Sequence, residues 1–322
     1  MTPNFDTGCV RVQLTCADAK VTLVRTRIER PDAAIALRGR IADRAVQMIP
    51  LLFALCGQAQ ARAAALALAA ARGEECEPQL DPDVQREVLR EHLWRFLLDL
   101  PPVLGGVALL REFVSATKWI AEGNRVELHE LLNNQRIASL RQRLRLTEGS
   151  HPLSSRMLPR LDAKESLAEW PRFTGNFCRL PDWRGMPAGT GAVARQQQTG
   201  GCITSLFSAC WRARFDELVE WAAGDTQIGA GGTVSATPVA PGIGRAVVET
   251  ARGLLMHEIV LDGERIADYL IVAPTEWNFH PQGTLVDQLL GQEAGDRDAL
   301  QQHVARTVAA LDPCVPWELQ FV

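Results

Sequence analysis

The spacing of hydrophobic residues changes along the chain, and these changes constrain its fold more than any other feature. Residues 8–30 alternate between apolar and polar, which predicts an N-terminal β-hairpin. From 34 to 146 the apolar residues recur at helical spacing, and "CITSLFSACWRARFDELVEWAAG" returns to that pattern. "LLMHEIVLDGERIADYLIVAP" predicts a second hairpin with its turn at Asp262-Gly263. We expect an α+β fold, mostly helical, with N-terminal and C-terminal hairpins around a helical core.

The chain of 322 residues can bury one large core. We expect a single domain over 1–322, with a hairpin (1–33), a helical core (34–146), an irregular connection (148–202) and a C-terminal part (203–322). The connection is rich in proline, glycine and tryptophan. Such long connections are uncommon in compact domains unless they line a site.

Charge and hydropathy exclude several classes of partner. A net charge of -4 gives no electrostatic reason to expect nucleic acid or an anionic membrane. The N-terminal "MTPNFDTGCVRVQL" alternates and carries charge, unlike a secretion signal. Gln58, Gln60 and Arg62 interrupt the most apolar stretch, so we predict a buried helix or a pair of segments there rather than a membrane span. We therefore expect a cytoplasmic protein with reduced thiols.

Two of the eight cysteines stand in distinctive surroundings, and no two cysteines are spaced as C-x-x-C. Cys56 precedes Gly57, and a Cys-Gly step at the mouth of a helix would lower the thiol pKa and suit a metal ligand. Cys314 follows Asp312 and Pro313; the proline fixes how Cys314 projects, and Asp312 can cap a helix or orient a donor. Core packing remains the alternative for each thiol.

Other polar residues have both a functional and a structural interpretation. Arg252 precedes a glycine that permits close backbone approach, or it is a surface charge. Thr275 and Asn278 follow a predicted strand end, where polar groups are commonly presented to a ligand; loop packing is the alternative for Thr275. Glu91 and His92 lie on an otherwise apolar helix, where a solvated position is the default interpretation.

The common catalytic motifs are missing from the sequence. It holds no G-x-S-x-G, no Walker loop, no clean G-x-G-x-x-G and no histidine pair in a zinc arrangement. No paired acid–base constellation can be placed either.

Several stretches, taken in order, resemble motifs of nickel–iron hydrogenase large subunits. "DTGCVRVQL" resembles R-I-E-G-H-x-R-I, and "FALCGQAQARAA" resembles R-x-C-G-x-C-x-x-x-H. "REHLWRFLLDL" resembles a helix with an acidic residue before histidine. "ARGLLMHEIVLDGERIADYLIVAPTEWNFHPQG" closely resembles P-R-G-A-L-x-H…D-G…Y-x-x-V-x-P-T-T-W-N-x-S-P, and "LDPCVPWELQFV" resembles D-P-C-x-x-C-x-x-H. The match is strongest from about 245 to the end and weakest across 148–200.

The departures from these motifs concern the metal ligands. In the family two cysteines are terminal on nickel and two bridge nickel to iron. Cys56 and Cys314 fill the terminal positions, whereas Ala59 and Trp317 stand at the bridging positions. The resemblance also places substitutions at a proton-transfer glutamate and at three histidines, now Thr7, Cys9, Ala63 and Gln320. Nickel requires a soft thiolate set, so the resemblance implies a non-catalytic protein that binds no nickel.

Compared with the metal ligands, the family's residues around the iron are retained more fully in this sequence. The resemblance places Arg252, Pro274 and Thr275 on the cyanide-bearing side of the iron, where a guanidinium and a hydroxyl are suitable donors to cyanide nitrogen. It also implies that Glu91 holds Arg252 in place, and we count Asp312 among the expected cofactor-binding residues.

This pattern resembles the HupK/HoxV family of hydrogenase assembly proteins. The resemblance implies a scaffold whose Cys56 and Cys314 anchor iron with cyanide and carbon monoxide ligands as transient cargo. Expected partners are the maturation chaperone, the iron-cyanation complex and the hydrogenase large subunit precursor, which would receive the cargo. The alternatives are a metal-free decoy that binds the chaperones and an enzyme on the same fold. Whether Cys9 joins the two thiols stays open.

Overall fold

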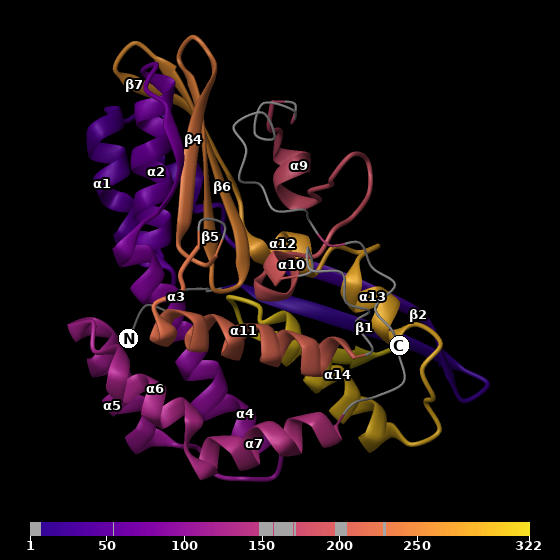
Figure 1. The fold of residues 1–322 in the computed structure, drawn as a ribbon. Helices are drawn as coiled ribbons and strands as arrows, with labels where there is room; N and C mark the ends of the chain where they lie inside the picture. The colour runs from indigo at the N-terminus through magenta and orange to yellow at the C-terminus, as the bar shows by residue number, and fades with distance from the viewer. Residues whose placement is uncertain are drawn as a thin grey trace, which may run out of the picture.

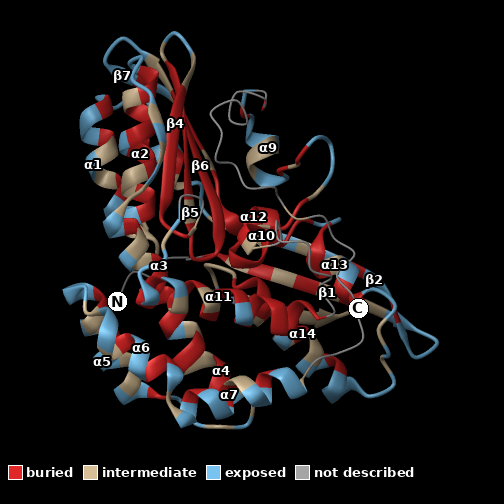
Figure 2. Ribbon diagram, in the orientation of Figure 1, coloured by how far each residue is buried: buried red, intermediate tan, exposed pale blue. Residues whose placement is uncertain are grey.

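The computed structural model contains two β-sheets and a layer of helices (Figure 1), which confirms the α+β fold. Figure 2 shows that β4 and β6, the strands on either side of the central strand of the larger sheet, are mostly buried. The structure describes residues 8–53, 55–147, 157, 170, 172–196, 205–227 and 230–322.

The smaller sheet joins the two ends of the chain. The predicted hairpin is confirmed as β1 (Cys9–Ala17) and β2 (Lys20–Glu29), which pair antiparallel. A strand that the sequence did not predict, β8 (Trp317–Phe321), pairs parallel with β1 in the order β2-β1-β8. The Val10 amide donates to the Pro316 carbonyl at 2.9 Å. This pairing brings the C-terminal cysteine segment back against the N-terminal hairpin.

The larger sheet contains the predicted C-terminal hairpin and three further strands. All neighbouring strands are antiparallel. Their order is β3 (Cys76–Leu80), β4 (Thr233–Ala240), β5 (Ile243–Thr250), β6 (Gly253–Asp262) and β7 (Arg265–Val272). The predicted turn is wrong by one residue, because Asp262 pairs with Arg265 and the two loop residues are Gly263 and Glu264. The sequence did not predict β4 and β5, because this stretch is rich in glycine.

Helix α2 packs very close to the larger sheet. With α1 (Ala42–Leu52), α2 (Gly57–Ala71) covers one face of that sheet (Figure 1). A Cβ atom added at Gly244 on β5 would lie 2.0 Å from the Ala71 nitrogen, so this glycine permits close helix–strand packing. The buried alanines of α2 are Ala59, Ala63, Ala64, Ala67, Ala70 and Ala71. This contact fixes the C-terminal end of α2 relative to the sheet.

The remaining long helices form a layer beneath the sheet (Figure 1). The predicted helical region, residues 34–146, is confirmed apart from β3. From this region the layer takes α3 (Pro82–Trp94), the π-helical turn η2 (Arg95–Asp99), α4 (Leu100–Val103), α5 (Leu110–Glu122), α6 (Arg125–Asn133) and α7 (Gln135–Leu146). From later in the chain come α11 (Leu206–Ala223) and α14 (Arg297–Leu311).

Most of the predicted irregular connection lies outside the described residues. Its described part holds Trp170 and Phe173, which pack on the sheet together with Trp277 of α12. The short helices and turns are η1 (Ala33–Leu37), α9 (Gly175–Arg179), α10 (Ala192–Gln196), α12 (Pro274–Asn278) and α13 (Thr284–Leu289).

Candidate functional site

The fold brings Cys56 and Cys314 together from opposite ends of the chain. Cys56 is the N-cap residue of α2, and Cys314 follows the C-terminal end of α14. Both thiols are half-buried. They lie close enough that the charge of Cys314 contributes to raising the pKa of Cys56.

The predicted lowering of the Cys56 pKa is wrong. Burial chiefly, and then the charge of Cys314, raise the pKa of the Cys56 thiol to about 12. The N-terminal end of α2 does not counter this effect, because Glu87 already binds its free amides. Glu87 Oε2 accepts from Gln58 N at 2.8 Å, and Oε1 accepts from Ala59 N at 3.1 Å. The carboxylate neutralises the positive end of the helix dipole beside the thiol.

Cys314 is held by two donors. The Thr275 hydroxyl donates to Cys314 Sγ at 3.1 Å and accepts from the Cys314 amide at 3.2 Å. Arg30 Nη1 lies 3.9 Å from the same sulfur, and Arg30 Nη2 pairs with Glu276 Oε1 at 2.7 Å. Pro274 starts α12 and so sets the direction of Thr275. In this arrangement the Thr275 hydroxyl proton is directed at the thiol.

Sequence reasoning missed Arg30 altogether. It lies just after β2 and is 284 residues from Cys314 along the chain. Its position after a predicted strand end was the only local signal. The contact with Cys314 depends on the pairing of the two chain ends.

Arg252 is the central cation of the site. Its Nη2 donates to Glu91 Oε2 at 3.0 Å, and its Nε lies 3.5 Å from Asp312 Oδ2. Arg252 is only 5% exposed, Glu91 3% and His92 1%, so the surface interpretation of all three was wrong. Burial acts to lower the pKa of Arg252, but Asp312, Glu91 and then the two thiols outweigh it and raise that pKa. The guanidinium therefore lies within electrostatic reach of both thiols.

Asp312 links Arg252 to a second arginine. Its Oδ1 accepts from Arg95 Nη2 at 2.8 Å, and its backbone is left-handed (φ 53°) at the end of α14. Burial acts to raise the Asp312 pKa, but Arg252, Arg95 and Arg214 together lower it. Asp312 is therefore a buried carboxylate within a cluster of guanidiniums.

His92 belongs to a different network. Its Nε2 lies 2.8 Å from Glu217 Oε2, and Arg195 also binds this carboxylate from the other side. All three side chains are buried. This network stabilises the packing of α3 against α10 and α11 and does not reach the thiols.

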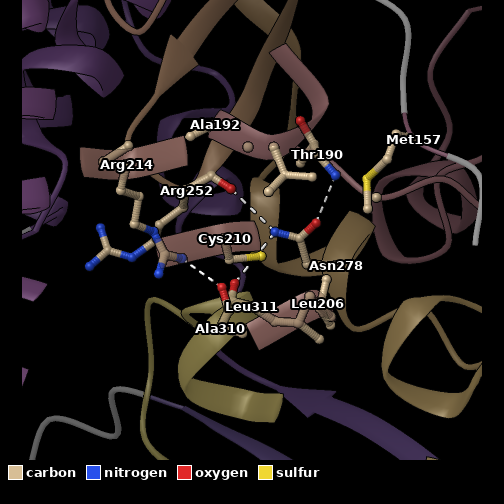
Figure 3. Close-up of a pocket in the computed structure, with 14 residues that line it drawn as sticks. Met157, Thr190, Ala192, Leu206, Cys210, Arg214, Arg252, Asn278, Ala310 and Leu311 are labelled. Atoms are coloured by element: carbon tan, nitrogen blue, oxygen red, sulfur yellow. Dashed lines mark hydrogen bonds between the residues drawn. The ribbon is translucent and has the colours of Figure 1, made fainter. Parts of the chain in front are cut away.

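A small cavity lies behind the Arg252 backbone (Figure 3). Its volume is about 20 Å³, which is room for one water molecule. Asn278 crosses it: Oδ1 accepts from Thr190 N at 2.8 Å, and Nδ2 donates to the carbonyl of Arg252 at 3.2 Å. The side-chain amide of Asn278 therefore links the backbone at Thr190 to the backbone at Arg252.

A larger pocket opens beside Cys314. It has a volume of about 380 Å³, and Leu55, Arg95, Asp312, Cys314 and Trp317 are among its lining residues. The half-buried Trp317, which stands at a bridging-cysteine position of the resemblance, therefore forms part of the pocket wall.

The described residues offer few further ligands. Among them, no group of three or more histidine, cysteine, aspartate or glutamate side chains is arranged to hold a metal ion. The Cys9 thiol donates to the Val10 carbonyl at 3.5 Å, and Ala59 is fully buried in α2. Thr7 lies outside the described residues. A metal at Cys56 and Cys314 would thus need to bring most of its ligands with it.

The fold is that of nickel–iron hydrogenase large subunits. An NAD+-reducing [NiFe]-hydrogenase superposes with a TM-score of 0.61 at 16% identity, covering 92% of this chain and 93% of the other. The [NiFeSe] hydrogenase of Desulfovibrio vulgaris Hildenborough gives 0.58 at 16% identity, with coverages of 93% and 94%. The family model for nickel-dependent hydrogenase matches residues 190–316.

Closer relatives define the family. The chain is 31% identical to the hydrogenase expression/formation protein HoxV of Cupriavidus necator, over 91% of each chain. It is 29% identical to the hydrogenase expression/formation protein HupK of Rhizobium leguminosarum bv. viciae, over 99% of this chain and 98% of that one. The chain belongs to the HoxV/HupK family of hydrogenase expression/formation proteins, as the sequence motifs predicted.

Among the described residues, no helix combines the length and the apolarity needed to span a membrane.

Proposed function

We propose that this protein is a non-catalytic scaffold of hydrogenase maturation. It carries iron with cyanide and carbon monoxide ligands and delivers this cargo to a hydrogenase large subunit precursor. The observation that carries the proposal is the convergence of Cys56 and Cys314 beside the buried Arg252. Family membership supports the maturation role, and the thiol pair supports a metal cargo.

The charge of the site suits this cargo. Divalent iron bound by cyanide and two thiolates carries net negative charge, and burying that charge requires compensation. Arg252 lies within electrostatic reach of both sulfurs, and Arg30 Nη1 lies 3.9 Å from Cys314 Sγ. Arg252 Nε is buried, forms only a 3.5 Å ion pair with Asp312 Oδ2 and makes no hydrogen bond within the described residues, so its N–H can serve a further acceptor. A cyanide nitrogen is an acceptor of the right kind.

The number of protein ligands suits a carrier. Two thiolates anchor the iron, and the cyanide and carbon monoxide that travel with it complete its coordination. Nickel would lack the two further thiolates at Ala59 and Trp317, so we expect none to bind. A site with only two protein bonds can also release its cargo.

The pocket beside Cys314 is the route that we propose for transfer. It opens from the sulfur to the surface and is lined by Arg95, Asp312 and Trp317. We expect the maturation chaperone, the iron-cyanation complex and the large subunit precursor to dock on the face around this pocket.

Infrared spectroscopy with iron quantification tests the proposal. The protein is purified anaerobically from a host with the hydrogenase maturation machinery. We expect cyanide and carbon monoxide stretching bands together with iron. Both should vanish in the double variant Cys56→Ser, Cys314→Ser. The control is Cys16→Ser, which removes an exposed thiol on β1 and should leave the bands unchanged.

Two results would contradict the proposal. Wild-type protein without iron and without bands would favour the metal-free decoy that binds the maturation chaperones. Bands of equal intensity in wild type and the double variant would show that the cargo is held elsewhere.

A further inference from the structure

A buried chain of hydrogen bonds leads away from Cys56. Gln60, one turn further along α2, has its Nε2 atom 3.7 Å from Cys56 Sγ. Its Oε1 lies 2.9 Å from His257 Nε2 on β6, and His257 Nδ1 lies 2.8 Å from the Tyr269 hydroxyl on β7. Gln60 is 2% exposed, and His257 and Tyr269 are fully buried. Three separate elements thus meet in one polar chain beneath the thiol.

The partners in this chain determine which atom donates at each step. The carbonyl oxygen of Gln60 has no proton, so His257 Nε2 must donate to it. Burial lowers the pKa of His257 to about 3, so the ring is neutral and has one proton. His257 Nδ1 is therefore the acceptor, and the Tyr269 hydroxyl donates to it. This protonation pattern gives a hydrogen-bond partner to each of four groups: the Tyr269 hydroxyl, the His257 ring, the Gln60 amide and the Cys56 sulfur.

This pattern and the orientation of the Gln60 amide, whose NH₂ group faces Cys56, require each other. With the His257 proton on Nε2, the amide oxygen must point to the ring and the NH₂ group must point to the sulfur. The opposite histidine tautomer would leave the Tyr269 hydroxyl proton without an acceptor among the described residues. It would also reverse the amide and place its oxygen against the sulfur, where it would repel a metal-bound thiolate. Tyr269 thus controls the Gln60 donor through His257.

We propose that Gln60 is a positioning residue for Cys56: locked by His257 and Tyr269, it presents an N–H donor that holds the Cys56 sulfur in place for the cargo. The inference rests on the proposed function and identifies how one of its two anchors is oriented. Cys314 has a different support, a hydroxyl from Thr275 and a guanidinium from Arg30. The two anchors therefore differ, since Cys56 is supported by a neutral amide.

Packing alone would explain buried polar residues only in part. A histidine and a tyrosine joined by one hydrogen bond already satisfy each other, but His257 Nε2 would then lack a partner. Gln60 supplies that partner, and its remaining NH₂ group is directed at the sulfur. Side chains that orient metal ligands in this way typically change metal affinity ten- to a hundredfold when removed.

The first test measures the histidine tautomer in metal-free protein. Nitrogen-15 NMR of selectively labelled histidine should show a neutral His257 ring with the proton on Nε2. A proton on Nδ1 would overturn the inference, because Gln60 would then direct its oxygen at Cys56. This readout needs no iron, so it decides the inference even if the carrier proposal fails.

The second test compares protein loaded in the maturation host. Gln60→Met keeps the side-chain length and removes the donor, and Tyr269→Phe removes only the hydroxyl that fixes the tautomer. We expect about tenfold or greater loss of iron retention on dialysis in Gln60→Met, and a smaller loss in Tyr269→Phe. The carbon monoxide band should move to lower wavenumber in both variants, because a thiolate without its donor gives more electron density to iron.

The matched control is Thr237→Val. It removes the hydroxyl of a buried residue on β4, in the same sheet, which donates to the Pro238 carbonyl at 3.4 Å, and it should change neither iron retention nor the band. Unchanged retention and band position in Gln60→Met would overturn the inference. An equal effect in Thr237→Val would also overturn the inference, because the loss in Gln60→Met would then reflect a general loss of stability. A wild type without bands would instead contradict the carrier proposal itself.

Discussion

Replacing Asp312 by asparagine tests whether the site depends on one buried carboxylate. Asp312 is 4% exposed and pairs with Arg95 at 2.8 Å and with Arg252 at 3.5 Å. Arg214 is a third cation whose charge acts on it. The asparagine keeps an acceptor oxygen but removes the charge. Arg252, Arg95 and Arg214 then lose the one carboxylate charge on which all three act.

The expected loss of stability is large. Removing one partner of a buried ion pair typically costs about 3–5 kcal/mol. Here Glu91 still pairs with Arg252 and Asp99 still pairs with Arg95, so we expect the lower end, about 3 kcal/mol. The matched control is Asp99→Asn. It breaks the other ion pair of Arg95 at a side chain that is 38% exposed, and it should cost less than about 1 kcal/mol.

Urea unfolding at pH 7 measures both variants against wild type. The pKa of Asp312 is lowered in the folded protein, so its contribution is present above the ordinary aspartate pKa and is lost as the pH falls through the folded value. The difference between wild type and Asp312→Asn should therefore shrink when the pH is lowered below about 4. A loss at pH 7 no greater than that of Asp99→Asn would refute this electrostatic reasoning.

Three further predictions concern the anchor, the packing of α2 and the missing ligands. Thr275→Val removes the hydroxyl that donates to Cys314 Sγ and should lower iron retention about tenfold or more. Thr275→Ser keeps the hydroxyl and should retain iron as wild type does; dialysis followed by iron quantification compares the two variants. Gly244→Ala places a Cβ atom 2.0 Å from the Ala71 nitrogen and should lower the free energy of unfolding by about 1–3 kcal/mol or more; equal urea midpoints would contradict that packing. Ala59→Cys with Trp317→Cys adds two thiolates, and nickel retained after dialysis by this variant but not by wild type would support the proposed reason for excluding nickel.

Local patterns in the sequence determined several features of this protein. Strict alternation predicted the hairpin of β1 and β2, and the Cys-Gly step predicted a helix that begins beside Cys56. The motif order predicted the hydrogenase-like fold and the family. These features depend on the hydrophobic period and on residue types over short stretches, which can be read without knowing the tertiary contacts.

Only the tertiary structure decided the electrostatics of the site. The sequence suggested a lowered pKa for Cys56, but burial and the charge of Cys314 raise it, and Glu87 from a neighbouring helix binds the amides that would have lowered it. The sequence favoured a solvated position for Glu91, but the packing of α3 against the site buries this side chain. Arg30 reaches Cys314 because β8 pairs with β1 across the whole length of the chain. Burial and pairing between distant residues set these interactions, and they depend on how whole elements pack together rather than on any local pattern.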